Sequence, residues 1–146
     1  MNTATLSRQS SQTPIWLKIV SVIGVIWYAF GLLQFWMGYS MDPAAVAAAG
    51  EISAGHAAAI AQTPGLIWLS FASASAAGLV GSLLLFKRSR TAVTVFTISL
   101  IAGVIYYVWV YGLSGTGSAR PSEEIIIMLV VLGVTLGFNV LSRKQT

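Results

Sequence analysis

The side chains that could carry enzymatic chemistry are few, and they form no recognisable constellation. The chain has one histidine, His56, and no cysteine, so it cannot supply the usual nucleophile–base pair within its apolar segments or a metal site built from several His and Cys ligands. It also has no glycine loop of the phosphate-cradling type. We therefore expect no enzyme activity, no cofactor and no bound metal. We interpret His56 as a solvated residue on a surface helix.

Polar side chains inside the apolar segments are the remaining candidates. Gln34 lies well inside the first segment, where it could bind a polar solute or form a hydrogen bond to a neighbouring helix; we favour the interhelical bond. The same two interpretations apply to Thr135 and Asn139, and Asn139 could also simply reach the interface. Tyr106 and Tyr107 lie deep in the third segment, and a buried phenol needs a hydrogen-bond partner. Gln34, Tyr106 and Tyr107 are thus the candidate substrate-binding residues.

Four apolar segments surround these residues, at about 15–39, 65–86, 91–113 and 123–141. Each approaches the ~20 residues that a helix needs to cross a bilayer. The 146-residue chain is 56% hydrophobic and only 8% charged, whereas soluble domains carry about 25% charged residues. We predict an all-α bundle of four transmembrane helices, with residues 13–146 as one domain after a mobile N-terminus, 1–12. The first segment is too long for a cleaved signal peptide, so we interpret it as a retained span.

The charges are sorted by connector. Seven of the eight basic residues flank one side of the predicted spans, and Arg120 alone lies on the other side with all four acids; the seven are Arg8, Lys18, Lys87, Arg88, Arg90, Arg143 and Lys144. This bias predicts that both termini are cytoplasmic. Because the basic residues sit at span ends, we attribute the net charge of +4 to the membrane surface and exclude nucleic acid as a partner. Lys87, Arg88 and Arg90 could contact anionic lipid headgroups.

The connectors have different predicted structures. Residues 40–64 contain ten alanines from Ala44 to Ala61, with caps at Asp42 and Ser53, which predicts a short broken helix on the extracytoplasmic surface. Residues 87–90 are so short a link that the second and third spans must form an antiparallel hairpin. Residues 114–121 form a Gly/Ser turn.

Small residues repeat at helical spacing on several spans and predict close helix packing. They are Gly24, Gly31 and Gly38 on the first span, Ser70, Ala74, Gly78 and Ser82 on the second, and Gly133 and Gly137 on the fourth. One bundle can use two such faces, so the third suggests a homo-oligomer. Aromatic residues gather toward the extracytoplasmic side, as in an interfacial belt, and could alternatively stack on a sugar; they are Trp36, Tyr39, Trp68, Trp109 and Tyr111.

Several short motifs resemble small bacterial four-span inner-membrane proteins that genomes label as sugar transporters. They are Thr13-Pro14-Ile15-Trp16-Leu17-Lys18, Gly31 with Gln34-Phe35, Ser40-Met41, Ala77-Gly78-Leu79-Val80-Gly81, Lys87-Arg88 and Ser99-Leu100. The resemblance covers roughly residues 13–113. Tyr28 stands where such proteins often have Asn, and Tyr106 stands where Gln is common, so a solute would be handled differently here.

The resemblance implies sugar transport, and two function classes follow. The first is a passive, oligomeric carrier of a small polar solute such as a sugar. No span has a charged residue or histidine at its centre, which argues against an ion-coupled pump. Because four helices are too few to wrap a sugar-sized pocket of ~300 Å³ or more comfortably, we expect a carrier to need a dimer. The alternative is a non-transporting accessory subunit that binds another membrane protein, and a more remote third is a lipid-binding regulator.

Overall fold

The computed structural model describes residues 13–146, and these residues form helices and no strands. Four long helices dominate: α1 (Ile15–Ser40), α4 (Gly65–Phe86), α5 (Thr91–Val108) and α6 (Ser122–Gln145). A π-helical turn, η2 (Trp109–Leu113), continues α5, so the third apolar segment is helical throughout. All four long segments are long and apolar enough to cross a membrane, which confirms the predicted fold class. The proposed mobile segment, residues 1–12, lies outside the described residues.

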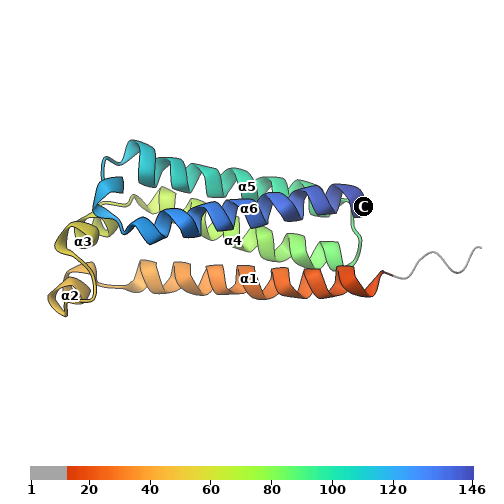
Figure 1. Ribbon diagram of the computed structural model, residues 1–146, viewed down its shortest axis with the longest axis horizontal. Coiled ribbons are helices and arrows are strands. Elements are labelled where there is room, and N and C mark those ends of the chain that lie inside the picture. Colours follow the sequence, from red (N-terminus) through yellow and green to blue (C-terminus); the bar gives the residue numbers. More distant parts are fainter. Residues whose placement is uncertain (1–12) are drawn as a thin grey trace, which may run out of the picture.

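The four long helices run along a common axis, as Figure 1 shows. Helix α4 packs closely against α1 on one side and α5 on the other, and α5 also packs against α6. The short link after Phe86 makes α4 and α5 an antiparallel hairpin, as predicted. By contrast, α1 and α6 are not among the closely packed pairs. The seam between α1 and α6 is therefore the loosest part of the bundle.

The first connector folds as two short helices, α2 (Pro43–Ala48) and α3 (Ala54–Ala61). The Asp42 carboxylate caps α2 by accepting from the backbone N–H groups of Ala44 and Ala45, and Pro43 occupies the first turn. The Ser53 hydroxyl caps α3 by accepting from the N–H of His56. Both helices lie together at one end of the bundle, opposite the end that carries the C-terminus (Figure 1). We call these the connector end and the terminal end.

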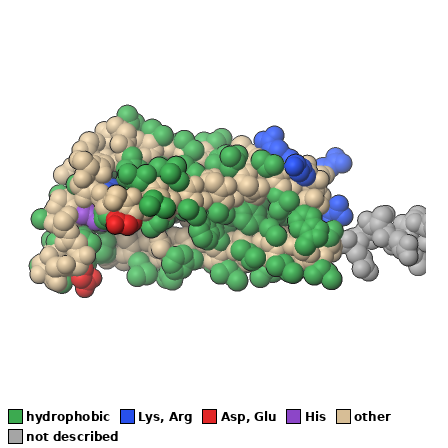
Figure 2. All heavy atoms as spheres, viewed as in Figure 1, with side chains coloured by type: hydrophobic (Ala, Val, Ile, Leu, Met, Phe, Trp, Pro, Cys, Tyr) green, Lys and Arg blue, Asp and Glu red, His purple; other side chains and the backbone are tan. Residues whose placement is uncertain are grey.

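The charged residues separate between these two ends. Figure 2 shows Lys and Arg side chains gathered at the terminal end, and Asp, Glu and His side chains at the connector end. Arg88, Arg90 and Lys87 are exposed at the terminal end, where Arg88 Nε also donates to the carbonyl of Gln145 at 3.3 Å. Large apolar side chains remain exposed along the helices between the ends, including Ile26, Leu33 and Ile126. An apolar girdle between two polar ends is what a bilayer requires, so this is a multi-pass membrane protein.

Small residues set how closely the helices approach. A Cβ added at Gly31 would lie 2.8 Å from Ser75 Oγ, and one added at Gly24 would lie 2.5 Å from Ser82 Oγ and 2.8 Å from the Phe138 ring. Gly38 meets the Trp68 ring in the same way. The first small-residue stripe therefore faces α4 over its whole length. Such close approach is how helices associate where lipid removes the hydrophobic driving force.

The terminal half of the bundle is solid. Its core consists of Leu17, Tyr28, Leu85, Ala92, Phe96 and Phe138, of which four are fully buried. The Phe96 ring stacks on Phe138 with centroids 5.4 Å apart. Leu17, Leu85 and Ala92 line neither of the two cavities described below. The hollow part of the molecule lies toward the connector end.

Candidate solute-binding site

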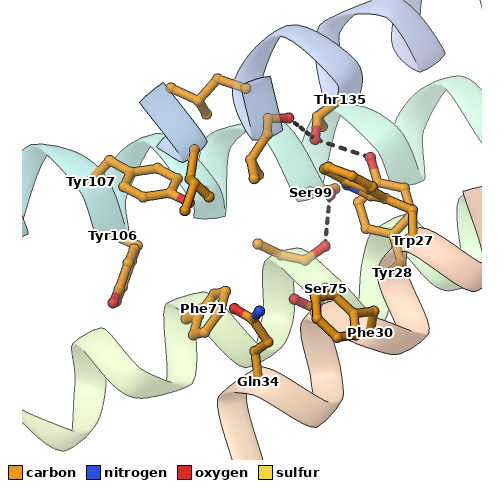
Figure 3. Close-up of a pocket in the computed structure, with 16 residues that line it drawn as sticks. Trp27, Tyr28, Phe30, Gln34, Phe71, Ser75, Ser99, Tyr106, Tyr107 and Thr135 are labelled. Atoms are coloured by element: carbon orange, nitrogen blue, oxygen red, sulfur yellow. Dashed lines mark hydrogen bonds between the residues drawn. The ribbon is translucent and has the colours of Figure 1, made fainter. Parts of the chain in front are cut away.

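An inner cavity of about 130 Å³ lies between the four long helices. Every long helix contributes to its wall: Gln34 comes from α1, Phe71 from α4, Tyr106 from α5 and Val131 from α6. Figure 3 shows these helices surrounding the pocket, with the Gln34 amide directed toward Phe71 and Ser75. Because all four spans supply lining groups, the bundle as a whole makes this site.

Three hydroxyl groups that line this cavity, on Tyr28, Ser99 and Thr135, are already engaged, whereas the buried Ser75 hydroxyl has no hydrogen-bond partner among residues 13–146. Tyr28 donates to Thr135 Oγ1 at 3.0 Å, and Ser99 donates to the Ala74 carbonyl at 2.6 Å (Figure 3). Thr135 also donates to the Val131 carbonyl. The remaining wall is mostly aromatic and aliphatic. The inner cavity is thus a mostly apolar chamber in which the Tyr28, Ser99 and Thr135 hydroxyls have partners, while Ser75 and the polar residues shared with the next cavity do not.

A larger outer cavity of about 340 Å³ lies toward the connector end. It reaches His56 and Ile60 of α3, Trp68 of α4, and the residues around Arg120. The two cavities share five lining residues: Gln34, Phe71, Tyr106, Tyr107 and Ile127. They are therefore consecutive chambers of one hollow, with these shared residues between them.

Gln34 is one of the shared residues, although we had favoured an interhelical hydrogen bond for it. The structure gives the Gln34 side chain no hydrogen bond to any residue of 13–146. Gln34 lies where α1 faces the hollow, and its amide is directed toward Phe71 and Ser75 of α4 without a hydrogen bond to either (Figure 3). Its amide is free to bind a solute or water.

Tyr106 and Tyr107 form an aromatic wall between the chambers. The Tyr106 ring stacks on Phe71 with centroids 4.9 Å apart and planes at 24°, and it meets Tyr107 edge-on. Neither hydroxyl has a hydrogen-bond partner within the described chain. The structure therefore brings together the three sequence-predicted site residues, Gln34, Tyr106 and Tyr107, on one hollow.

A charged cluster forms part of the wall of the outer chamber near the connector end. His56 Nε2 lies 3.2 Å from Glu124 Oε1, and Arg120 lies 3.4 Å from Glu124 Oε2. The Tyr111 hydroxyl donates to the same carboxylate at 3.3 Å. Glu124 therefore links α6 to α3 and to the end of the third span.

His56 corrects one sequence interpretation. It is 9% exposed rather than solvated, because α3 packs against the short turn η3 (Gly117–Ala119) that precedes α6, which brings His56 to Glu124. Its partner is not the nearby Glu51, which is exposed. The pairing joins residues distant in sequence, and the local pattern of α3 gave no sign of it.

Asn139 and Thr135 form interhelical hydrogen bonds. Asn139 Nδ2 donates to Thr97 Oγ1 at 2.9 Å, and its Oδ1 accepts from Arg143 Nε at 2.9 Å. Asn139 is 4% exposed, so it does not reach the interface as one interpretation held. It ties α6 to α5 in the solid half and takes no part in the hollow.

The predicted aromatic belt divides into two groups. Trp36 and Tyr39 are 64% and 58% exposed, as belt residues are. Trp68 and Tyr111 instead line the outer chamber. Both groups lie near the connector end of their spans, so their positions in the sequence do not distinguish them. The rotation of each helix about its axis decides whether a ring faces outward or lines the chamber.

Arg120, Glu124 and Phe71 are site residues that the sequence analysis did not select. Two signals could have pointed to the first two: Arg120 is the one basic residue on its side, and it stands only four residues before the acidic Glu124. Phe71 carried no signal, since an aromatic residue in an apolar span is ordinary.

No protein-family model, curated protein or solved structure matches this chain. The class of the molecule, a four-span helical membrane protein with an internal hollow, therefore rests on its own geometry. The resemblance to sugar-transporter-like proteins stays an expectation.

Proposed function

We propose that this protein binds a small polar solute in the joined chambers and carries it passively across the membrane. The observation that supports the proposal most is that Gln34 and Tyr106 line both chambers of one hollow. Both side chains are polar, and their hydrogen-bonding groups have no partner in the described chain. Convergent polar groups on an otherwise apolar cavity are the usual mark of a small-molecule site.

The volume of the outer chamber supports binding by a single copy. Its 340 Å³ falls within the range of ligand pockets, which begins at about 300 Å³. A dimer is therefore not needed to provide a pocket of sufficient volume. A homo-oligomer remains part of the proposal on other grounds, namely the unoccupied small-residue face of α6.

The solid terminal half favours a carrier over an open pore. Leu17, Leu85 and Phe96 are fully buried beneath the hollow, so no continuous passage runs through the bundle. With the basic terminal end in the cytoplasm of a bacterium, the hollow opens toward the extracytoplasmic side. Transfer would then require a second conformation that opens the terminal half.

Solute uptake by reconstituted protein tests this proposal. Proteoliposomes are assayed with a panel of radiolabelled sugars, and Gln34→Leu is compared with the parent. We expect normal stability but lost uptake, because the site loses its hydrogen-bonding group. Gln62→Leu is the matched control, since Gln62 is exposed on the connector side outside both chambers. Uptake by Gln34→Leu equal to the parent would remove Gln34 from the site.

The second candidate function is an accessory subunit, and one observation favours it. A Cβ added at Gly133 or Gly137 would meet nothing within 4 Å, so this small-residue face of α6 is not used within the bundle. A partner helix could pack there closely. This alternative predicts no solute uptake at all, with crosslinks from Gly137→Cys to a different protein. The third candidate, lipid regulation through Lys87, Arg88 and Arg90, predicts tighter binding to anionic vesicles.

A further inference from the structure

The inner chamber borders the lipid along the seam between α1 and α6. Phe30 on α1 and Ile127 on α6 both line the chamber, yet each is 56% exposed on the apolar outer surface. Because α1 and α6 do not pack closely, these two side chains are what separates the chamber from the hydrocarbon. A molecule dissolved in the bilayer therefore has a shorter route into this chamber than one dissolved in water.

The inner chamber is suited to an apolar group. Its deepest hydroxyls, on Tyr28 and Ser99, already donate to protein oxygens, and hydrophobic side chains such as Trp27 and Leu132 supply much of the remaining wall. A polar group placed there would lose its water without gaining an equal set of hydrogen bonds. An alkyl or other apolar group makes no hydrogen bonds with water, so it would lose none on entering the chamber.

The outer chamber, unlike the inner one, favours a polar group, because Arg120 lines it. Its side chain is 7% exposed, it lines the chamber, and its Nε has no hydrogen-bond partner in residues 13–146. A buried guanidinium N–H without a partner is costly, and it can donate but not accept. The group that completes this site must therefore bring an acceptor oxygen.

The charge around Arg120 limits what carries that oxygen. Glu124 lies 3.4 Å from the guanidinium and offsets its charge. A carboxylate ligand would face the Glu124 carboxylate, and an ammonium ligand would face Arg120. Like charges at such distances in a poorly solvated site repel strongly. An uncharged head, such as a hydroxyl or carbonyl, meets neither penalty.

We propose that the ligand of this hollow is an uncharged amphiphile that enters from the bilayer between α1 and α6. Its apolar part fills the inner chamber, and an oxygen of its head accepts a hydrogen bond from Arg120 Nε. The seven helical steps from Glu124 to Val131 span about 10 Å, a length that a medium alkyl chain covers. The inference rests on the site of the proposed function and names the chemical class of its ligand.

Photolabelling in lipid nanodiscs tests this inference. The full chain is illuminated with a diazirine-bearing octanol, and labelled residues are identified by mass spectrometry. We expect saturable labelling of residues such as Phe30 and Val131 at the seam. Octanol should compete, whereas octanoate and octylammonium at equal concentration in the bilayer should compete poorly. Equal or better competition by octanoate would overturn the uncharged class.

Two variants locate the ligand. Val131→Trp fills the inner chamber and should abolish saturable labelling, while Val130→Trp on the exposed face beside it should not. Arg120→Lys keeps the positive charge but removes Nε, and it should weaken labelling about tenfold. Arg88→Lys, at the terminal end, is its control. Unchanged labelling in Arg120→Lys would mean that a water molecule, and not the ligand, accepts the hydrogen bond from Arg120 Nε. That result would overturn the role of Arg120 as the anchor.

Failure of this inference is distinguishable from failure of the proposed function. Uptake of a sugar without saturable octanol labelling would contradict the amphiphile and leave the carrier standing. Saturable labelling that Val131→Trp abolishes, with no solute moved across proteoliposomes, would support the amphiphile and contradict the carrier. Unsaturable labelling that is equal in the parent and Val131→Trp would overturn the inference outright.

Discussion

The Tyr28 hydroxyl donates a hydrogen bond to Thr135 Oγ1 at 3.0 Å, and this contact joins α1 to α6 across the loosest seam of the bundle. Both residues line the inner chamber, and Tyr28 also belongs to the solid core. The pair therefore lies at the floor of the hollow. The Tyr28 ring packs in the core, and the Tyr28 hydroxyl forms the hydrogen bond to Thr135. Two substitutions of Tyr28 can test these roles one at a time.

Tyr28→Phe should reduce the free energy of unfolding only slightly. Interhelical hydrogen bonds in membranes average about 0.6 kcal/mol, and the ring contacts with Phe96 and Phe138 remain. Tyr28→Ala should cost about 3 kcal/mol or more, because it leaves a cavity in the core. Denaturation with SDS in mixed micelles measures both values. Equal losses for the two variants would contradict this division between ring and hydroxyl.

Gly78→Ala should destabilise the bundle, because a Cβ at Gly78 would overlap the Tyr28 ring. Overpacking of this kind typically costs about 1–3 kcal/mol. Gly133→Ala is the matched control, since its new methyl group meets nothing within 4 Å. Thermal unfolding in detergent should show a lower midpoint for Gly78→Ala alone. A shift of the same size in both variants would argue against close packing between α1 and α4.

Gly137→Leu should weaken self-association without unfolding the protein. The position is exposed and open, so a larger side chain is tolerated within one copy but blocks the approach of a second helix. Gly112→Leu is a control at another open glycine. Crosslinking in membranes gives the oligomeric state. An oligomer that persists in Gly137→Leu would exclude this face as the interface.

Topology is tested with reporters fused after Thr146. The bias of seven basic residues against one predicts a cytoplasmic C-terminus, so a reporter active only in the cytoplasm should function there. A reporter inserted at the exposed Gly50, between α2 and α3, should show the opposite pattern. Activity of a periplasm-only reporter at Thr146 would reverse the orientation and place the hollow on the cytoplasmic side.

Much of the fold could be predicted because it depends on local signals. Length and hydropathy identify each span, and the caps at Asp42 and Ser53 identify α2 and α3. The second span begins and ends where the sequence indicated, at Gly65 and Phe86. The fourth extends further, to Gln145, because Arg143 and Lys144 continue the last turn rather than ending it.

The site could be predicted only in part, because it depends on how the helices are rotated. Gln34 stood out as an amide within an apolar span, but its lack of a partner follows from the gap between α1 and α6. The contact of His56 with Glu124 joins the first connector to the first turn of α6, and no local pattern encodes their relative position. The unpaired Nε of Arg120 is likewise a consequence of tertiary packing.

The most direct test of a solute-accessible hollow uses single cysteines, because the chain has none of its own. A membrane-impermeant methanethiosulfonate reagent is added from the connector side to vesicles that carry Gln34→Cys. Leu33→Cys is the lipid-facing control at 51% exposure, and Ser21→Cys is the control in the solid half at 0%. We predict rapid modification of Gln34→Cys alone, with all three variants reactive after unfolding. A Gln34→Cys thiol as unreactive as the two controls would contradict the hollow, and with it the proposed binding site.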